Sequence, residues 1–191
     1  MLDRIFISAD IEGTCGICHW DETELNKPDY DPFRRQMTAE VAAACEGATA
    51  GGCDGIYVKD AHDSARNLLP ALLPENIQIF RGWGSDIHSM MSGIDASFAG
   101  AIFTGYHSAA NMDASPLSHT MNTQNCSIRI NGIQTSEMVM NAVTAAYYDV
   151  PVFMITGDAG VCEAAKRLNP NIFTVPVHVG RGNGKIGRAH V

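Results

Sequence analysis

Two hydrolase signatures are missing from this sequence, because neither H-E-x-x-H nor G-x-S-x-G occurs in its 191 residues. Their absence counts against a zincin and against a serine hydrolase with a nucleophile elbow. Basic residues are also scarce: 13 Lys and Arg stand against 21 Asp and Glu, and the formal net charge is -8. An acidic chain disfavours nucleic acid as a partner, since phosphates need Lys and Arg to neutralise them.

Long hydrophobic runs are absent too. No apolar stretch in the sequence approaches the ~18 residues that a membrane span requires. The opening MLDRIFISAD holds only a short apolar run that ends at Asp10, unlike the longer apolar region of a signal peptide. We therefore expect a cytoplasmic protein with no membrane partner. The six cysteines fit that setting, because a reducing compartment leaves them as small hydrophobic residues.

The sequence that remains alternates short apolar runs with helix-like segments. Apolar runs predict strands at residues 5–9, 55–59, 77–80, 97–104, 151–156 and 172–177. Helices are predicted at residues 32–50, 87–91, 136–148 and 158–168. Asn131-Gly132 predicts a local β-hairpin within residues 127–134. This alternation predicts an α/β fold with a largely parallel sheet flanked by helices.

The C-terminal residues differ from what precedes them. Residues 185–191 read KIGRAHV, which is similar to the translation of a sequencing adapter and continues no strand or helix pattern. We expect one domain over residues 1–184 and a non-native tail over residues 185–191. On that interpretation the domain is the N-terminal part of a longer protein whose C-terminal portion is missing.

Residue types that bind metals follow three of the predicted strands. Asp10 and Glu12 follow the first strand, His62 the second and His107 the fourth, and Glu137 stands in the first turn of a predicted helix. In open α/β sheets, ligands bind outside the carboxyl ends of the strands. Three carboxylates and two imidazoles suit Zn²⁺ or Mn²⁺. Five ligands exceed the needs of one catalytic zinc, so we expect two ions with Asp10 as the bridging ligand.

Each of these residues has an ordinary structural interpretation when taken alone. An Asp after a strand is commonly a turn or cap residue, and a Glu in the first helical turn commonly interacts with the helix dipole. Asp10 and Glu12 also lie two residues apart, so an extended backbone would point them to opposite faces. The turn at Gly13 must bend the chain if both are to face one site. The metal-site hypothesis therefore rests on the whole set.

The set occurs within motifs that resemble a known family, the zinc D-aminopeptidases that form self-compartmentalising rings. Residues 8–13, SADIEG, resemble the SxDxEG signature of that family, and the resemblance extends from residue 4 to about residue 178. The further matching segments are KDAHDS at 59–64, GYH at 105–107, SHTM at 118–121, Ser136-Glu137 with Asn141-Ala142, YYDVPV at 147–152, and Gly157-Asp158.

The resemblance implies an activity and roles for the site residues. Asp10, Glu12, His62, His107 and Glu137 would bind two Zn²⁺ per chain, and His119 would be the catalytic histidine that assists the attack of an activated water. The implied substrates are short peptides with D-amino-acid N-termini, and the implied assembly is a homo-decamer. Two features depart from the family pattern: the chain diverges after Val179, and residues 14–19, TCGICH, are not typical of the family.

Other functions remain open on the sequence alone. A metal-dependent phosphoesterase or another amidohydrolase could use the same ligands, and Lys59, Arg66 and Arg81 are candidate phosphate-binding residues. A non-catalytic metal-binding oligomeric domain is a third possibility. Two motif matches are set aside: C-x-x-C-H at residues 15–19 leads into a loop, and G-x-G-x-x-G at residues 182–187 is followed by no helix.

Overall fold

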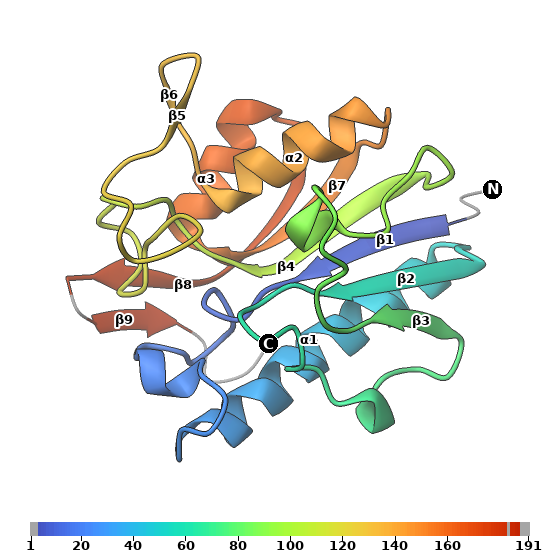
Figure 1. The fold of residues 1–191 in the computed structure, drawn as a ribbon, viewed down its shortest axis with the longest axis horizontal. Coiled ribbons are helices and arrows are strands. Elements are labelled where there is room, and N and C mark those ends of the chain that lie inside the picture. The colour runs from blue at the N-terminus through green and yellow to red at the C-terminus, as the bar shows by residue number, and fades with distance from the viewer. Residues whose placement is uncertain (1–3, 183, 188–191) are drawn as a thin grey trace.

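The computed structural model describes residues 4–182 and 184–187. Seven strands form one sheet in the order β3-β2-β1-β4-β7-β8-β9, with every neighbouring pair parallel except β8 and β9 (Figure 1). The strands are β1 (Arg4–Ala9), β2 (Gly55–Asp60), β3 (Ile77–Phe80), β4 (Gly100–Tyr106), β7 (Val152–Asp158), β8 (Phe173–Arg181) and β9 (Gly184–Gly187). The α/β fold expected from the sequence is confirmed.

Three α-helices cover the two faces of the sheet. Helix α1 (Tyr30–Ala50) lies on one face, whereas α2 (Glu137–Tyr147) and α3 (Ala159–Leu168) lie on the other (Figure 1). Single turns of 3-10 helix occur at η1 (Trp20–Glu22), η2 (Pro70–Leu72) and η3 (Ser89–Met91). A separate hairpin of β5 (Arg129–Ile130) and β6 (Ile133–Gln134) projects from the body. Within the described residues, none of the helices combines the length and hydropathy needed to cross a bilayer.

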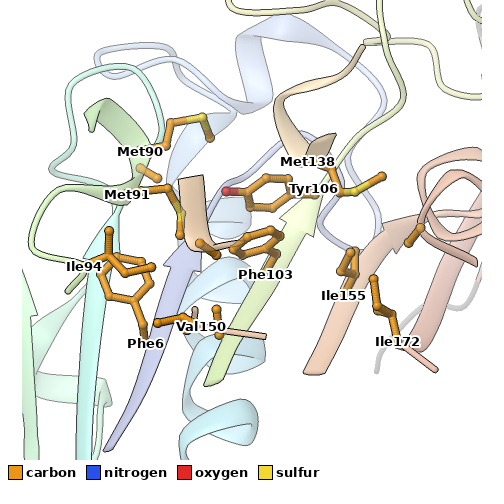
Figure 2. Packing of buried hydrophobic residues seen from close by; sticks show 14 of the residues in the cluster. Phe6, Met90, Met91, Ile94, Phe103, Tyr106, Met138, Val150, Ile155 and Ile172 are labelled. Atoms are coloured by element: carbon orange, nitrogen blue, oxygen red, sulfur yellow. The ribbon is translucent and has the colours of Figure 1, made fainter. Parts of the chain in front are cut away.

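Alternation along β1 divides the apolar core in two. Ile5 and Ile7 point into a cluster beneath α1, and Phe6 points into a cluster beneath α2 and α3. Figure 2 shows the second cluster, in which Phe103 and Tyr106 of β4 stack with ring centroids 4.9 Å apart. Parallel strands buried on both faces read as continuous apolar runs, which explains why these strands were visible in the sequence.

Several element boundaries differ from those predicted. The predicted helix at 87–91 is only the 3-10 turn η3, and the strand predicted at 97–104 begins at Gly100 and continues to Tyr106. The helix predicted from residue 32 begins at Tyr30, and the turn η1 before it has no counterpart in the prediction. Local propensity does not distinguish a single helical turn from a loop, because packing against neighbouring segments stabilises such turns.

The boundary proposed between residues 184 and 185 falls inside β9, which pairs antiparallel with β8. Residues 188–191 lie outside the described part of the chain. The interpretation of residues 185–191 as a non-native tail therefore stays a prediction, and β9 is an element that the sequence pattern did not indicate.

Candidate metal centre

The candidate site lies where the direction of strand addition reverses. The chain passes from β1 through β2 to β3 on one side, and then returns to place β4 on the other side of β1. In doubly wound folds this switch point opens a crevice at the carboxyl ends of the strands. Asp10 follows β1, and His107 follows β4. The topology thus brings the two residues to adjacent strand ends.

The bend at Gly13 depends on a close approach of two backbones. Gly13 N donates to Gly105 O at 2.8 Å, and a Cβ at Gly13 would lie 1.8 Å from Tyr106 O. Gly105 has a φ of 67°, and a Cβ there would lie 2.3 Å from Asp10 O. Because neither residue carries a side chain, the loop after β1 lies directly against the end of β4. This contact places Asp10 and Glu12 beside His107.

A substitution at Gly13 tests this contact. We expect Gly13→Ala to lower the free energy of unfolding by about 1–3 kcal/mol, because the new methyl group must displace the backbone of Tyr106. Gly47→Ala is the matched control, since a Cβ at Gly47 meets nothing within 4 Å. It should raise that free energy by about 0.5–1 kcal/mol through helix propensity. Urea unfolding of both variants measures the effects, and an unchanged midpoint for Gly13→Ala would contradict the close approach.

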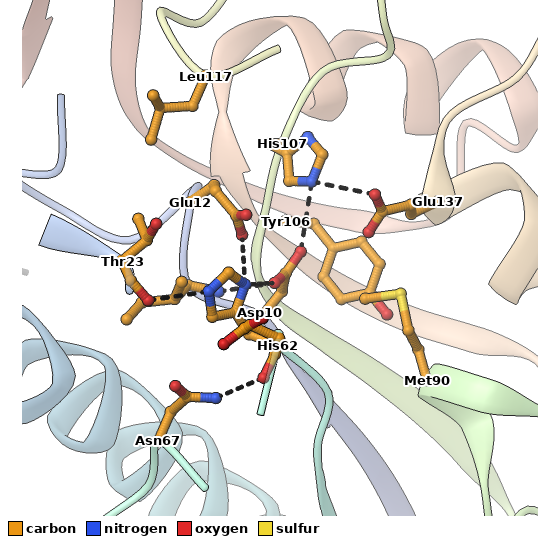
Figure 3. Close-up of polar contacts among 12 residues, drawn as sticks. Asp10, Glu12, Thr23, His62, Asn67, Met90, Tyr106, His107, Leu117 and Glu137 are labelled. Atoms are coloured by element: carbon orange, nitrogen blue, oxygen red, sulfur yellow. Dashed lines mark hydrogen bonds and ion pairs between the residues drawn. The ribbon is translucent and has the colours of Figure 1, made fainter. Parts of the chain in front are cut away.

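All six residues singled out in the sequence lie together in the structure. His62 Nδ1 is 3.4 Å from Asp10 Oδ1 and 3.1 Å from Glu12 Oε2. His107 Nε2 is 3.5 Å from both Asp10 Oδ2 and Glu137 Oε1 (Figure 3). His119 Nε2 is 3.5 Å from Glu137 Oε1 and 3.7 Å from Glu12 Oε1. The loop after β4 therefore returns His119 to the same cluster.

The three histidines share one hydrogen-bonding arrangement. In each of them, the ring nitrogen that faces away from the carboxylates lies within hydrogen-bond distance of a backbone carbonyl oxygen. The three pairs are His62 Nε2 with Thr23 O at 2.9 Å, His107 Nδ1 with Ser108 O at 3.0 Å, and His119 Nδ1 with Leu117 O at 2.9 Å. A carbonyl accepts only from a protonated nitrogen. In the neutral rings, the nitrogens that face the carboxylates consequently carry lone pairs, as metal-ligating histidines do.

The cluster fits a divalent cation. Among the described residues, Asp10 Oδ2, Glu12 Oε2 and His107 Nε2 are buried and have no hydrogen-bond partner. Buried polar atoms without partners are costly, and cations bound at this cluster would satisfy them. Two sets of ligand atoms close enough to hold an ion share Asp10: one adds Glu12 and His62, and the other adds His107 and Glu137. Neither set contains sulfur, which suits zinc in a catalytic site.

The pKa shifts of the cluster residues also indicate a site that favours a bound cation. Burial and the neighbouring Glu12 carboxylate raise the pKa of Asp10 to about 8. Burial alone would lower the pKa of His62 and of His107, but the carboxylates outweigh it and raise both well above the usual value. Without metal, the cluster thus recruits protons to balance its negative charge. Burial and the neighbouring His107 lower the pKa of His119, which favours its neutral form.

Residues outside the cluster hold its side chains in place. Asp158 caps α3 through Val161 N and also accepts from Ser108 N at 2.6 Å and Ser108 Oγ at 2.5 Å. Ser108 in turn bonds the His107 ring, so Asp158 helps to orient that imidazole. The sequence analysis placed Asp158 at a helix start and in a segment that resembles the family, and gave it no role in the site. A carboxylate on the last residue of β7, at the same sheet edge as the candidate metal-binding residues, was the available signal.

A cavity of about 810 Å³ opens over the cluster. Its remaining walls include two indoles, two carboxylates and small polar side chains, contributed by Trp20, Thr23, Glu24, Ala61, Asp63, Trp83, Ser89, Met90, Met121, Asn122 and Thr123. No Lys or Arg lines this cavity in the part of the chain that the structure describes. The volume suits a small ligand such as a short peptide.

The candidate phosphate-binding residues lie away from the cavity walls. Lys59 is fully buried and donates to Asp60 O at 2.8 Å and Gly82 O at 2.7 Å. Arg81 donates to Arg66 O at 3.3 Å, and both arginines are exposed. A phosphate ester in the cavity would therefore face carboxylates without a Lys or Arg side chain beside it.

Comparison with known proteins gives concordant matches. The model of a peptidase family described as D-aminopeptidase matches residues 3–188. A D-aminopeptidase of Bacillus subtilis (strain 168) is 33% identical over 176 residues, which cover 91% of this chain and 63% of the relative. A solved structure, the Zn-dependent D-aminopeptidase DppA from Bacillus subtilis, described as a self-compartmentalizing protease, matches with a TM-score of 0.89. That match has 30% identity and covers 97% of this chain and 68% of DppA.

Proposed function

Because this chain belongs to the D-aminopeptidase family, we propose that it is a zinc metallopeptidase that removes N-terminal residues, preferably D-amino acids, from short peptides. The observation that carries the proposal is the buried cluster of three carboxylates and three imidazoles at the floor of an open cavity. The chain spans 63% of the length of its curated relative, so the activity is proposed for the whole protein.

The charge of the cavity supports an amine-bearing substrate over a phosphate ester. Glu24 and Asp63 are exposed and line the wall above the cluster, while no basic side chain does so among the described residues. A peptide with a free N-terminus brings a positive charge, which such a wall attracts. A phosphate ester brings negative charge, which it repels. An aminopeptidase is thus the better match than a metal-dependent phosphoesterase.

Two zinc ions are proposed, held by Asp10, Glu12, His62, His107 and Glu137, with Asp10 shared between the two sites. Zinc in such a site supplies Lewis acidity and lowers the pKa of water. His119 is not needed as a ligand in either of the two sets that share Asp10. Its Nε2 faces the cluster while its Nδ1 is held by Leu117 O. His119 is therefore placed to accept a proton from the attacking water and return it to the leaving amine.

The setting of the enzyme is also a proposal. We place it in the cytoplasm, which is supported by the absence of any disulfide among the six cysteines, all of which lie in the described residues. We propose a homo-oligomer of ten subunits, as the family resemblance implies. Ile87 and Tyr147 support association, because their side chains are 96% and 82% exposed.

Paired substrates test the activity. Zinc-loaded protein should hydrolyse D-alanyl p-nitroanilide at least about tenfold faster, as kcat/KM, than the L-alanyl compound. A chelator should abolish both activities, and added zinc should restore them. p-Nitrophenyl phosphate is the control for the competing function. Faster turnover of the phosphate ester than of either amide would refute the aminopeptidase, whereas a preference for the L-amide would refute only the stereochemical part.

A further inference from the structure

The 3-10 turn η1 and the residue after it contact two imidazoles of the cluster. The Trp20 ring meets the His119 ring edge-on, with centroids 5.1 Å apart and an interplanar angle of 72°. Thr23 O meets His62 Nε2 at 2.9 Å, as Figure 3 shows. His62 and His119 come from different loops, and the four-residue segment 20–23 contacts both of their rings. The sequence analysis gave this segment no role.

The Trp20 contact closes the free side of the His119 ring. On another side the His107 ring stacks against it, with centroids 4.1 Å apart and planes 8° from parallel. Leu117 O fixes Nδ1. His119 is therefore held by a parallel ring, an edge-on ring and one hydrogen bond, while Nε2 faces the carboxylates. Removing the indole would leave the imidazole held by the His107 ring and Leu117 O alone, and would open space on the side that the indole fills.

The turn is rigid enough to act on both rings together. The Thr23 amide and the Thr23 hydroxyl both donate to Trp20 O at 2.9 Å, and Thr23 is fully buried. Before the turn, the backbone amides of Cys18 and His19 donate to the Glu22 carboxylate at 2.5 Å and 2.9 Å. The His19 ring accepts a hydrogen bond from Asp21 N. These bonds form a reciprocal capping arrangement that fixes the start of the turn.

We propose that residues 20–23 form a positioning element for the reaction. Trp20 sets the orientation of the His119 ring, and the Thr23 carbonyl fixes the His62 tautomer that presents Nδ1 to the metals. The inference rests on the proposed function for its kinetic consequence only. Trp20 is a positioning residue: it acts through His119, and its effect on turnover is an effect on the geometry of proton transfer.

The two tryptophans of the chain provide a matched experiment, because both line the cavity and only Trp20 has a ring contact with His119 among the described residues. In zinc-loaded protein, Trp20→Ala should lower kcat about 10- to 100-fold, with KM changed by less than about threefold and zinc content unchanged. Trp20→Phe should recover most of the loss, because phenylalanine also offers a ring edge. Trp83→Ala removes the indole of the segment after β3 from the cavity wall and should act mainly on KM.

The second readout is independent of turnover. The nuclear Overhauser contacts between the His119 and His107 ring protons in the zinc-loaded protein, with the His119 signals assigned by their loss in His119→Ala, should weaken in Trp20→Ala and persist in Trp83→Ala. Unchanged contacts in Trp20→Ala would overturn the proposal, as would a loss of kcat that merely follows a loss of zinc. If the wild-type protein turned over no peptide, the proposed function would fail, and the ring-to-ring contacts would still decide whether Trp20 orders His119.

Discussion

Replacing His119 by alanine is expected to lower kcat by roughly 10²–10⁴ while both zinc ions stay bound. His119 Nε2 faces Glu12 and Glu137 at the floor of the cavity, yet neither of the two ligand sets that share Asp10 requires it. Peptide hydrolysis needs a base for the attacking water and an acid for the leaving amine. An imidazole can serve both needs near neutral pH, so its removal should slow the chemistry rather than empty the metal sites.

Steady-state kinetics together with elemental analysis separate the possible roles of His119. Loss of an ion in His119→Ala would make His119 a ligand, which the set of Glu12, His107 and His119 also allows geometrically. Unchanged turnover with intact metals would exclude it from the mechanism. His88→Ala is a suitable control, because His88 lies outside the cavity lining and bonds Asp86 and the Tyr148 hydroxyl instead.

Asp10→Asn should remove both metal ions, whereas the loss of an outer ligand should remove one. Asp10 belongs to both ligand sets, with Oδ1 near His62 and Oδ2 near His107. The amide has one ligand oxygen in place of two and carries no charge. We expect metal affinity to fall by more than about 100-fold, beyond the range typical of residues that only support a ligand.

The comparison with other carboxylates makes this prediction specific. Glu137→Gln should leave one ion per chain, and Asp63→Asn, which makes the same chemical change in the cavity wall, should leave two. Burial and Glu12 raise the pKa of Asp10 to about 8, so a neutral amide suits the metal-free fold and misfolding is not expected. Metal analysis after dialysis gives the result. Two ions retained in Asp10→Asn would contradict the bridging role.

The fold and the family could be predicted because their signals are local. Strands β1, β2 and β4 are buried on both faces and therefore read as apolar runs, and the residues directly after them carry the metal-binding types. The resemblance to the D-aminopeptidase family is confirmed by the family match over residues 3–188. The roles assigned to Asp10, His107 and the other cluster residues stay predictions.

The features that the sequence did not reveal depend on backbone atoms and on contacts between distant segments. Ser108 and Leu117 orient imidazoles through their carbonyl groups, which every residue type possesses, so no residue pattern marks them. Trp20 acquires a role only because the loop after β4 returns His119 to it, 99 positions along the chain. Asp158 is the exception, since its place at a strand end could have been noticed.

The strand order has a consequence for how the centre is assembled during synthesis. Asp10, Glu12 and His62 follow β1 and β2 and are synthesised early, but the bend at Gly13 that turns Glu12 toward the cluster lies against Gly105 and Tyr106 of β4. The second ligand set needs β4 as well, together with Glu137 at the start of α2. In a chain that emerges from the ribosome N-terminus first, we therefore expect neither set to be preorganised for a cation until β4 has been made and has paired with β1.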